Sequence, residues 1–160
     1  MTPDEISFAA DMMVGRLARW LRILGYDTLY NPEKSVQEWI PVVVADDRIL
    51  LTRNRKIEGQ LPKKNYYFVE PNDPREQLAE LIERFQLDTE RFLFRLCLLC
   101  NVPVVPVAKK EIVGQVPPLV FETHQEFWRC PACGRIYWRG SHLKRIREFL
   151  VRIRENYNRF

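Results

Sequence analysis

The chain has 160 residues, of which 46% are hydrophobic and 29% are charged. This composition is typical of a soluble globular protein, and no apolar run approaches the ~18 residues that a membrane span needs. The first residues lack the basic start and apolar stretch of a signal peptide, so we expect a cytoplasmic protein without a membrane partner.

The charge of the chain is unevenly distributed. The net charge is +4. From Arg139 to the last residue, seven basic residues stand against two acidic ones, a surplus of five. This local positive charge predicts either an anionic partner such as nucleic acid or a solvated helix face.

Strand and helix patterns alternate through the first part of the chain. Alternation of this kind, with connections long enough for parallel pairing, predicts an α/β domain with a mostly parallel sheet. The short apolar runs predict strands at Ile6–Ala10, Asp27–Tyr30, Ile49–Arg53 and Tyr66–Val69. Apolar periodicity predicts helices from Met13 to Leu24, from about Val36 to Val44, and after Asp73. In the second helix Pro41 is unfavourable, and Val42–Val44 suits a strand equally well.

Polar side chains follow three of these predicted strands. Asp11 comes after the first, Asn54 after the third, and Asp73 after the fourth. Because the carboxyl ends of parallel strands meet at one sheet edge, these side chains should converge there. Their oxygen atoms suit Mg²⁺ or Mn²⁺, which could activate water for phosphodiester cleavage. For Asp73, a helix cap is an alternative explanation.

Four cysteines form two C-x-x-C pairs near the C-terminus. Cys97 and Cys100 make the first pair, Cys130 and Cys133 the second, and 29 residues separate the pairs. Two such pairs predict a closed, tetrahedral, structural zinc site, which needs neither His124 nor His142. Binding of zinc would supply much of the folding energy of so small a module.

Aromatic residues lie beside the second cysteine pair. They could stack on unpaired bases or form the small core of the zinc module. They are Phe127, Trp128, Tyr137 and Trp138. After them, Gly140-Ser141 begins a last helix with an apolar stripe and basic residues on its other sides. The apolar stripe packs on the α/β body or on a protein partner.

Nearly the whole chain resembles the Mut-seven C-terminal RNase domain family, a PIN-like nuclease branch with a zinc ribbon. The resemblance rests on four stretches: Asp11–Tyr30, Arg48–Arg55, Cys97–Asn101 and Pro117–Arg147. It implies a PIN-like sheet flanked by helices over residues 1–92, a Cys₄ zinc ribbon over 93–140 and a basic helix over 141–160.

The resemblance also implies divalent-metal-dependent cleavage of RNA. Asp11 would be a ligand of Mg²⁺ or Mn²⁺, helped by Asn54 and by Asp73 or Glu38. Two positions differ from related sequences: the family usually has an aspartate at position 54, and an acid is often found near Val36. The RNA backbone would be bound by Arg16, Arg19, Arg53, Arg55, Lys144, Arg145 and Arg147.

Two functions are therefore predicted. The first is a metal-dependent endoribonuclease. The second is a catalytically degenerate RNA-binding or ribonucleoprotein-associated protein, which keeps the fold and the zinc ribbon without the chemistry. Both predict binding to RNA that weakens as salt is added.

Overall fold

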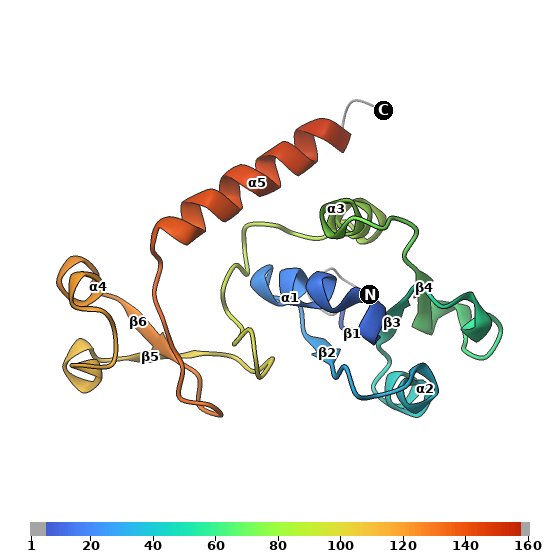
Figure 1. Cartoon of the computed structure of the whole chain (residues 1–160), viewed down its shortest axis with the longest axis horizontal. Helices are drawn as coiled ribbons and strands as arrows, with labels where there is room; N and C mark the ends of the chain where they lie inside the picture. The colour runs from blue at the N-terminus through green and yellow to red at the C-terminus, as the bar shows by residue number, and fades with distance from the viewer. Residues whose placement is uncertain (1–5, 158–160) are drawn as a thin grey trace. The chain divides into compact units, whose positions relative to one another are not determined.

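The computed structural model describes residues 6–157 and has two compact units, Met1–Phe94 and Arg95–Phe160 (Figure 1). The first unit contains a parallel sheet with helices, and the second contains a small antiparallel sheet and the four cysteines. The predicted fold class, an α/β domain followed by a cysteine-bearing module and a helix, is confirmed.

The sheet of the first unit has four parallel strands in the order β2-β1-β3-β4. The strands are β1 (Phe8–Ala10), β2 (Thr28–Tyr30), β3 (Ile49–Thr52) and β4 (Tyr66–Phe68). Phe8 of β1 pairs with Thr28 on one side and Ile49 on the other. All residues of β1 and β3 are buried, as expected for central strands of a parallel sheet that is covered on both faces.

Helices cover both faces of this sheet. On one face, Trp39 and Val43 of α2 (Val36–Ala45) pack in a core with Ala9 and Leu50. On the other face lie α1 (Gly15–Ile23) and α3 (Pro74–Phe85). There the ring of Phe8 meets that of Phe85, with centroids 5.5 Å apart. A short 3-10 helix, η2 (Met12–Val14), leads from β1 into α1.

The α2 segment is a helix despite its internal Pro41. Its start is stabilised by a capping box, in which the Glu38 carboxylate accepts hydrogen bonds from the backbone and hydroxyl of Ser35 at 2.7 Å. The burial of Trp39 and Val43 against the sheet adds to this stability. Packing of an apolar face and a good cap thus outweigh the lost backbone donor of proline.

Two further 3-10 helices lie in the connection between β3 and β4. They are η3 (Arg55–Ile57), after β3, and η4 (Lys63–Asn65), before β4. Near the amino end of β3, Asp47 has a positive φ of 50° and its carboxylate meets the Lys64 ammonium at 2.7 Å. Asp47 therefore belongs to a turn at the amino edge of the sheet, opposite to the edge where Asp11 and Asn54 follow their strands.

Gly25 ends the helical segment of α1 in a backbone conformation that other residues rarely adopt, with φ +88°. A Cβ atom at this position would overlap the carbonyl oxygen of Phe92 and lie 2.6 Å from its Cβ. Gly59 also has a positive φ, +83°, but no atom lies within 4 Å of its added Cβ.

We expect Gly25→Ala to destabilise the first unit much more than Gly59→Ala. In the Gly59 variant, the loss of stability comes only from the left-handed backbone conformation and is ~1–2 kcal/mol. The Gly25 variant also forces a clash with the backbone of Phe92, which adds roughly 1–3 kcal/mol. Denaturant unfolding of both variants measures the difference, and equal midpoints would contradict the close packing of Gly25 against Phe92.

The second unit has a three-stranded antiparallel sheet in the order β5-β6-β7. Its strands are β5 (Val105–Val107), β6 (Phe127–Arg129) and β7 (Ile136–Tyr137). Its helices are η5 (Lys109–Ile112), α4 (Pro118–Thr123) and the long α5 (Ser141–Tyr157). No helix in residues 6–157 is both long enough and apolar enough to cross a membrane.

Candidate functional site

A pocket of about 550 Å³ opens at the carboxyl edge of the parallel sheet. It lies between the turn after β1, the last residue of β2 and the start of α3. Arg16 and Arg19 of α1 bring positive charge to it. Its other lining residues are Met12, Met13, Val14, Gly15, Tyr30, Asn72, Pro74 and Gln77. The pocket thus stands where parallel α/β sheets commonly bind their ligands.

Tyr30 and Gly15 shape one wall of this pocket. A Cβ atom on Gly15 would lie 2.6 Å from Cζ of Tyr30. The phenol ring therefore lies directly over the beginning of α1, and a side chain at position 15 would displace it. Met12 and Met13 also line the pocket, and they are 65% and 56% exposed. Large apolar side chains this exposed are available for contact with a ligand.

Asp11 is the first residue after β1 and is buried, with 3% of its surface exposed. One carboxylate oxygen accepts a hydrogen bond from the backbone N–H of Met13 at 2.8 Å, and the other accepts one from the hydroxyl of Thr52. Burial raises the pKa of Asp11, although the bonds from Thr52 and Met13 act in the opposite direction. The charge of this carboxylate is thus only partly compensated by its neighbours, which favours a cation beside it.

Asn54, two residues beyond β3, connects to Asp11 through Thr52. Its backbone N–H donates to the Thr52 hydroxyl at 3.0 Å, and that hydroxyl donates to Asp11. The Asn54 side-chain oxygen accepts the backbone N–H of Lys56 at 3.0 Å and so caps η3. The amide is thereby held in place at the same edge of the sheet as Asp11.

The two other predicted carboxylates act as helix caps. Asp73 accepts the backbone N–H groups of Arg75 and Glu76 at 2.7 and 3.4 Å, at the start of α3. Glu38 belongs to the capping box of α2, and its hydrogen bonds to Ser35 lower its pKa. Among residues 6–157, the ligand atoms of Asp11, Glu38 and Asp73 do not form a group close enough to hold one ion.

The predicted phosphate-binding arginines of the first unit divide into two pairs. Arg16 and Arg19 line the pocket. Arg53 donates to the carbonyls of Val69, Glu70 and Pro71 at 2.5–2.8 Å and thereby fastens the segment after β4. Arg55 forms an ion pair with Glu70 at 3.2 Å and lies over the ring of Phe68. Arg53 and Arg55 are therefore engaged with their own unit.

The four cysteines form one group whose sulfur atoms all lie within 4.8 Å of one another. Sγ of Cys97 and Sγ of Cys133 are 3.8 Å apart, which is about the spacing of two thiolates on a tetrahedral zinc ion with Zn–S bonds of ~2.3 Å. None of the four is in a disulfide. The group is positioned to bind a metal ion, as the spacing of the C-x-x-C pairs predicts, and its all-sulfur donor set suits zinc.

Both cysteine pairs have the same backbone geometry. In each pair the N–H of the second cysteine points to the sulfur of the first, at 3.5 Å for Cys100 and 3.4 Å for Cys133. The residue that follows each pair has a positive φ, 59° at Asn101 and 75° at Gly134. Its backbone N–H donates a hydrogen bond of 2.9 Å to the carbonyl oxygen of the first cysteine of the pair. These backbone hydrogen bonds help to hold the sulfurs in place.

Tyr137 joins the first cysteine pair to the small sheet. Its hydroxyl lies 3.1 Å from Sγ of Cys97 and accepts the backbone N–H of Leu98 at 3.1 Å. Burial raises the pKa of the Cys97 thiol, but hydrogen bonds from Tyr137 and from the backbone outweigh it and hold this pKa at about 6. The thiolate form, which a metal needs, is therefore favoured at neutral pH.

The sequence matches a known protein family over most of its length. A model of the Mut7-C RNAse domain matches residues 6–150. The chain belongs to the Mut7-C RNAse domain family. The match spans the parallel sheet, the four cysteines and the first half of α5, so the predicted family is confirmed. No curated protein and no solved structure gives a significant match.

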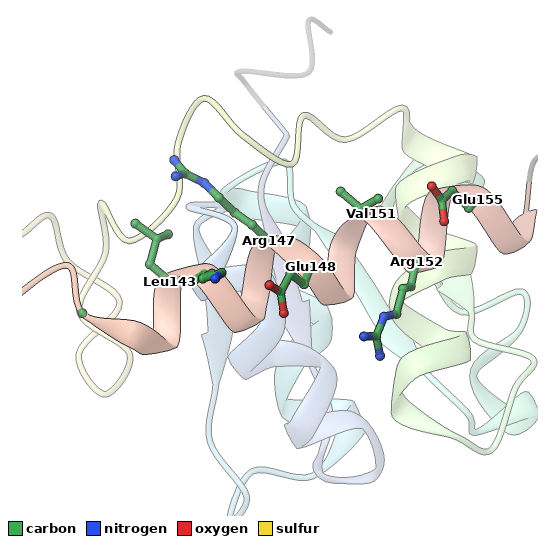
Figure 2. Close-up of a pocket in the computed structure, with 8 residues that line it drawn as sticks. Leu143, Arg147, Glu148, Val151, Arg152 and Glu155 are labelled. Atoms are coloured by element: carbon green, nitrogen blue, oxygen red, sulfur yellow. The ribbon is translucent and has the colours of Figure 1, made fainter.

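The basic residues of α5 in this family member share their helix with acidic ones. A shallow pocket of about 630 Å³ runs along α5. Arg147, Glu148, Arg152 and Glu155 are among the residues that line it (Figure 2). Lys144 also lines this pocket, and Arg145 is exposed. Because charges of both signs alternate there, the positive charge that the sequence concentrates in this segment is partly balanced on this face.

Sequence reasoning missed several residues of the site. Thr52 is hidden in the apolar pattern of β3, yet it bonds Asp11. Met13 and Tyr30 were predicted to lie in a helix and a strand without a functional role, and no role was predicted for Met12. The signal that could have found Met12, Met13 and Tyr30 is their position, because each lies within three residues of the carboxyl end of β1 or β2.

Proposed function

We propose that this protein is a metal-dependent endoribonuclease that cleaves phosphodiester bonds of RNA at the edge of the parallel sheet. The observation that carries the proposal is Asp11, a buried and incompletely compensated carboxylate next in sequence to an arginine-lined pocket, in a member of an RNase domain family. RNA, as the substrate, explains the arginines because they match phosphate in charge and geometry.

The ion that we propose at Asp11 is one hydrated Mg²⁺ or Mn²⁺. Such ions usually keep several waters and bind proteins through one or two carboxylates together with substrate phosphates. Asp11 would hold the ion, with the side-chain oxygen of Asn54 as a neutral second donor. When bound, the ion supplies Lewis-acid stabilisation of charge on the scissile phosphate and lowers the pKa of its water.

The residues of the chain have separate tasks in this mechanism. Thr52 and the backbone of Met13 hold the Asp11 carboxylate in one orientation. Arg16 and Arg19 bind phosphates of the RNA backbone in the pocket and so fix the scissile bond near Asp11. Asp73 and Glu38, which cap helices, keep the beginnings of α3 and α2 in place. The zinc ion on the four cysteines is structural.

A second candidate function is RNA binding without cleavage, alone or in a ribonucleoprotein. It is favoured by the absence, among the described residues, of three carboxylates close enough to share an ion. It also explains why the amide Asn54 occupies a position where the family usually has an aspartate. Turnover separates the two candidates, because both predict salt-dependent binding of RNA.

Replacing Arg16 and Arg19 together by glutamine should weaken both binding and cleavage of RNA. The loss of two phosphate contacts should reduce the slope of log affinity against log salt by ~0.7 for each contact. Fluorescence anisotropy with labelled RNA at several salt concentrations measures this slope, and a gel assay with Mn²⁺ measures cleavage.

The matched control replaces Lys63 and Arg84 by glutamine. This variant removes the same charge from the first unit, but Lys63 precedes β4 and Arg84 lies in the last turn of α3. Both positions belong to the amino edge of the sheet. If the control variant loses as much affinity and cleavage as the Arg16 and Arg19 variant, the pocket does not bind the RNA backbone.

A further inference from the structure

A second pocket, of about 430 Å³, lies beside the cysteine group in the second unit. Both cysteine pairs contribute to it, through Leu99 from the first and through Cys133 and Gly134 from the second. The remaining lining residues are Gln115, Arg135, Ile136 and Trp138. Every one of these residues belongs to Arg95–Phe160, so this pocket is distinct from the one at the sheet edge.

Trp138 forms a fixed aromatic wall of this pocket. A Cβ atom on Gly140 would lie 3.2 Å from Nε1 and 3.3 Å from Cδ1 of the indole. The edge of the ring therefore rests against the backbone of Gly140. The side chain is half-buried. An indole ring held in this way can stack on a flat polar ligand.

The other aromatic residues near the second cysteine pair have structural tasks. Phe127 is 2% exposed and belongs to the core of the small sheet. Tyr137 bonds the first cysteine pair, and the guanidinium of Arg139 covers the ring of Trp128. Of these four residues, Trp138 is the one that lines the pocket. The two roles predicted for these aromatic residues, packing in the small core and stacking on bases, thus belong to different residues.

The chemistry around Trp138 matches a nucleotide whose base is unpaired. Leu99, 56% exposed, and Ile136 offer apolar surface for the faces of a base. Arg135 is exposed and brings a positive charge for the attached phosphate. Gln115 is held by Glu111 and Arg129, with bonds of 2.9 and 3.1 Å, and presents an oriented amide. Bases in a duplex are stacked and paired, so they do not enter such a pocket.

We infer that this pocket binds an unpaired base of single-stranded RNA by stacking it on Trp138. RNA as the polymer rests on the proposed function, but the inference adds a preference for single strands and assigns it to the cysteine-bearing unit. It stands whether or not the site at Asp11 cleaves, because binding is measured without added Mg²⁺ or Mn²⁺.

The test compares the zinc-loaded full chain with its Trp138→Ala and Trp138→Phe variants. Fluorescence anisotropy is measured with a short unstructured RNA and with the same RNA annealed to its complement. Trp138→Ala should bind the single strand roughly 5- to 150-fold more weakly, because a base–aromatic stack is lost. Trp138→Phe should recover most of the affinity. The salt dependence should not change, since no charge is removed.

Duplex binding should stay the same in all three proteins. If Trp138→Ala binds the single strand as tightly as the unchanged chain, or loses affinity for both RNA forms equally, the inference is wrong. Trp128→Ala serves as a control, because it removes an indole of the same unit that does not line the pocket. Zinc content and thermal melting establish whether each variant is folded.

A second pair of variants decides the question if Trp138→Ala fails to hold zinc. Leu99→Glu places a carboxylate at the pocket, whereas Leu119→Glu places one elsewhere in the same unit, where Leu119 is 70% exposed. Both leucines are exposed, so the fold should tolerate both changes. Selective loss of single-strand binding in Leu99→Glu supports the pocket, and equal binding by the two variants overturns it.

Discussion

Replacing Cys97 by serine should unfold the second unit and release its metal. The three short strands and the two cysteine turns of this unit bury few large side chains, so metal binding supplies much of its folding energy. Structural zinc in small modules is worth ~10–16 kcal/mol at neutral pH. Elemental analysis should find about one zinc per unchanged chain and none in the variant, and limited proteolysis should cut between Arg95 and Phe160.

Leu99→Ser is the matched control for this prediction. It introduces the same serine into the same turn, but Leu99 is exposed and offers no ligand. The control should keep its zinc and its resistance to protease. A chelator should reproduce the effect of Cys97→Ser in the unchanged chain. A chain that stays folded without metal would show that the cysteine group has no structural role.

Asp11→Asn should stabilise the first unit while it removes cleavage. Burial raises the pKa of Asp11 in the folded protein above its ordinary value, so the folded state holds the proton more tightly than the unfolded state. Stability is then lost as the pH rises from below the ordinary pKa through the raised one. Asparagine carries no charge and avoids this loss at neutral pH.

Unfolding at several pH values checks the sign of this effect. The stability advantage of Asp11→Asn should be present at neutral pH and should shrink at acidic pH, where Asp11 is protonated in both states. Mn²⁺ should raise the melting temperature of the unchanged chain but not of the variant, since the variant lacks the one charged ligand of the ion. Asp46→Asn makes the same chemical change at the amino edge of the sheet and should affect neither cleavage nor the response to Mn²⁺.

The expected effect on cleavage is large. A metal ion contributes several kcal/mol to stabilisation of the transition state, so removal of its charged ligand should lower the rate by roughly 100-fold or more. A loss of stability together with activity would instead indicate a folding defect. Stability is expected to rise in Asp11→Asn while the cleavage rate falls. These opposite changes separate a functional role of Asp11 from a structural one.

Local signals made much of the fold predictable from the sequence. Ile49–Thr52 is a run of apolar and β-branched residues, and it forms the buried strand β3. Asp73-Pro74 is a favourable helix start, and Asp73 caps α3. The cysteine pairs have a spacing that few structures other than metal sites share, and their sulfurs meet. In each case the chemistry that decides the structure lies within a few neighbouring residues.

The site was less predictable because its contacts join distant parts of the chain. The sequence shows that Asp11 follows a strand, but not that Thr52, 41 residues later, donates to its carboxylate. It shows the charge of Arg53, but not the three backbone carbonyls that occupy its guanidinium. Side-chain partners across a sheet edge depend on strand order and loop paths, which local patterns do not encode.

Single-turnover cleavage of a labelled RNA, followed at increasing Mn²⁺ concentration, tests the assignment of ribonuclease activity to Asp11 most directly. We predict that the unchanged zinc-loaded chain cuts the RNA internally, that the rate rises with Mn²⁺ to a plateau, and that Asp11→Asn remains folded but leaves the RNA intact. If the unchanged chain binds the RNA yet cuts none of it at any Mn²⁺ concentration, or if Asp11→Asn cuts as fast, the protein is not a nuclease that works through Asp11.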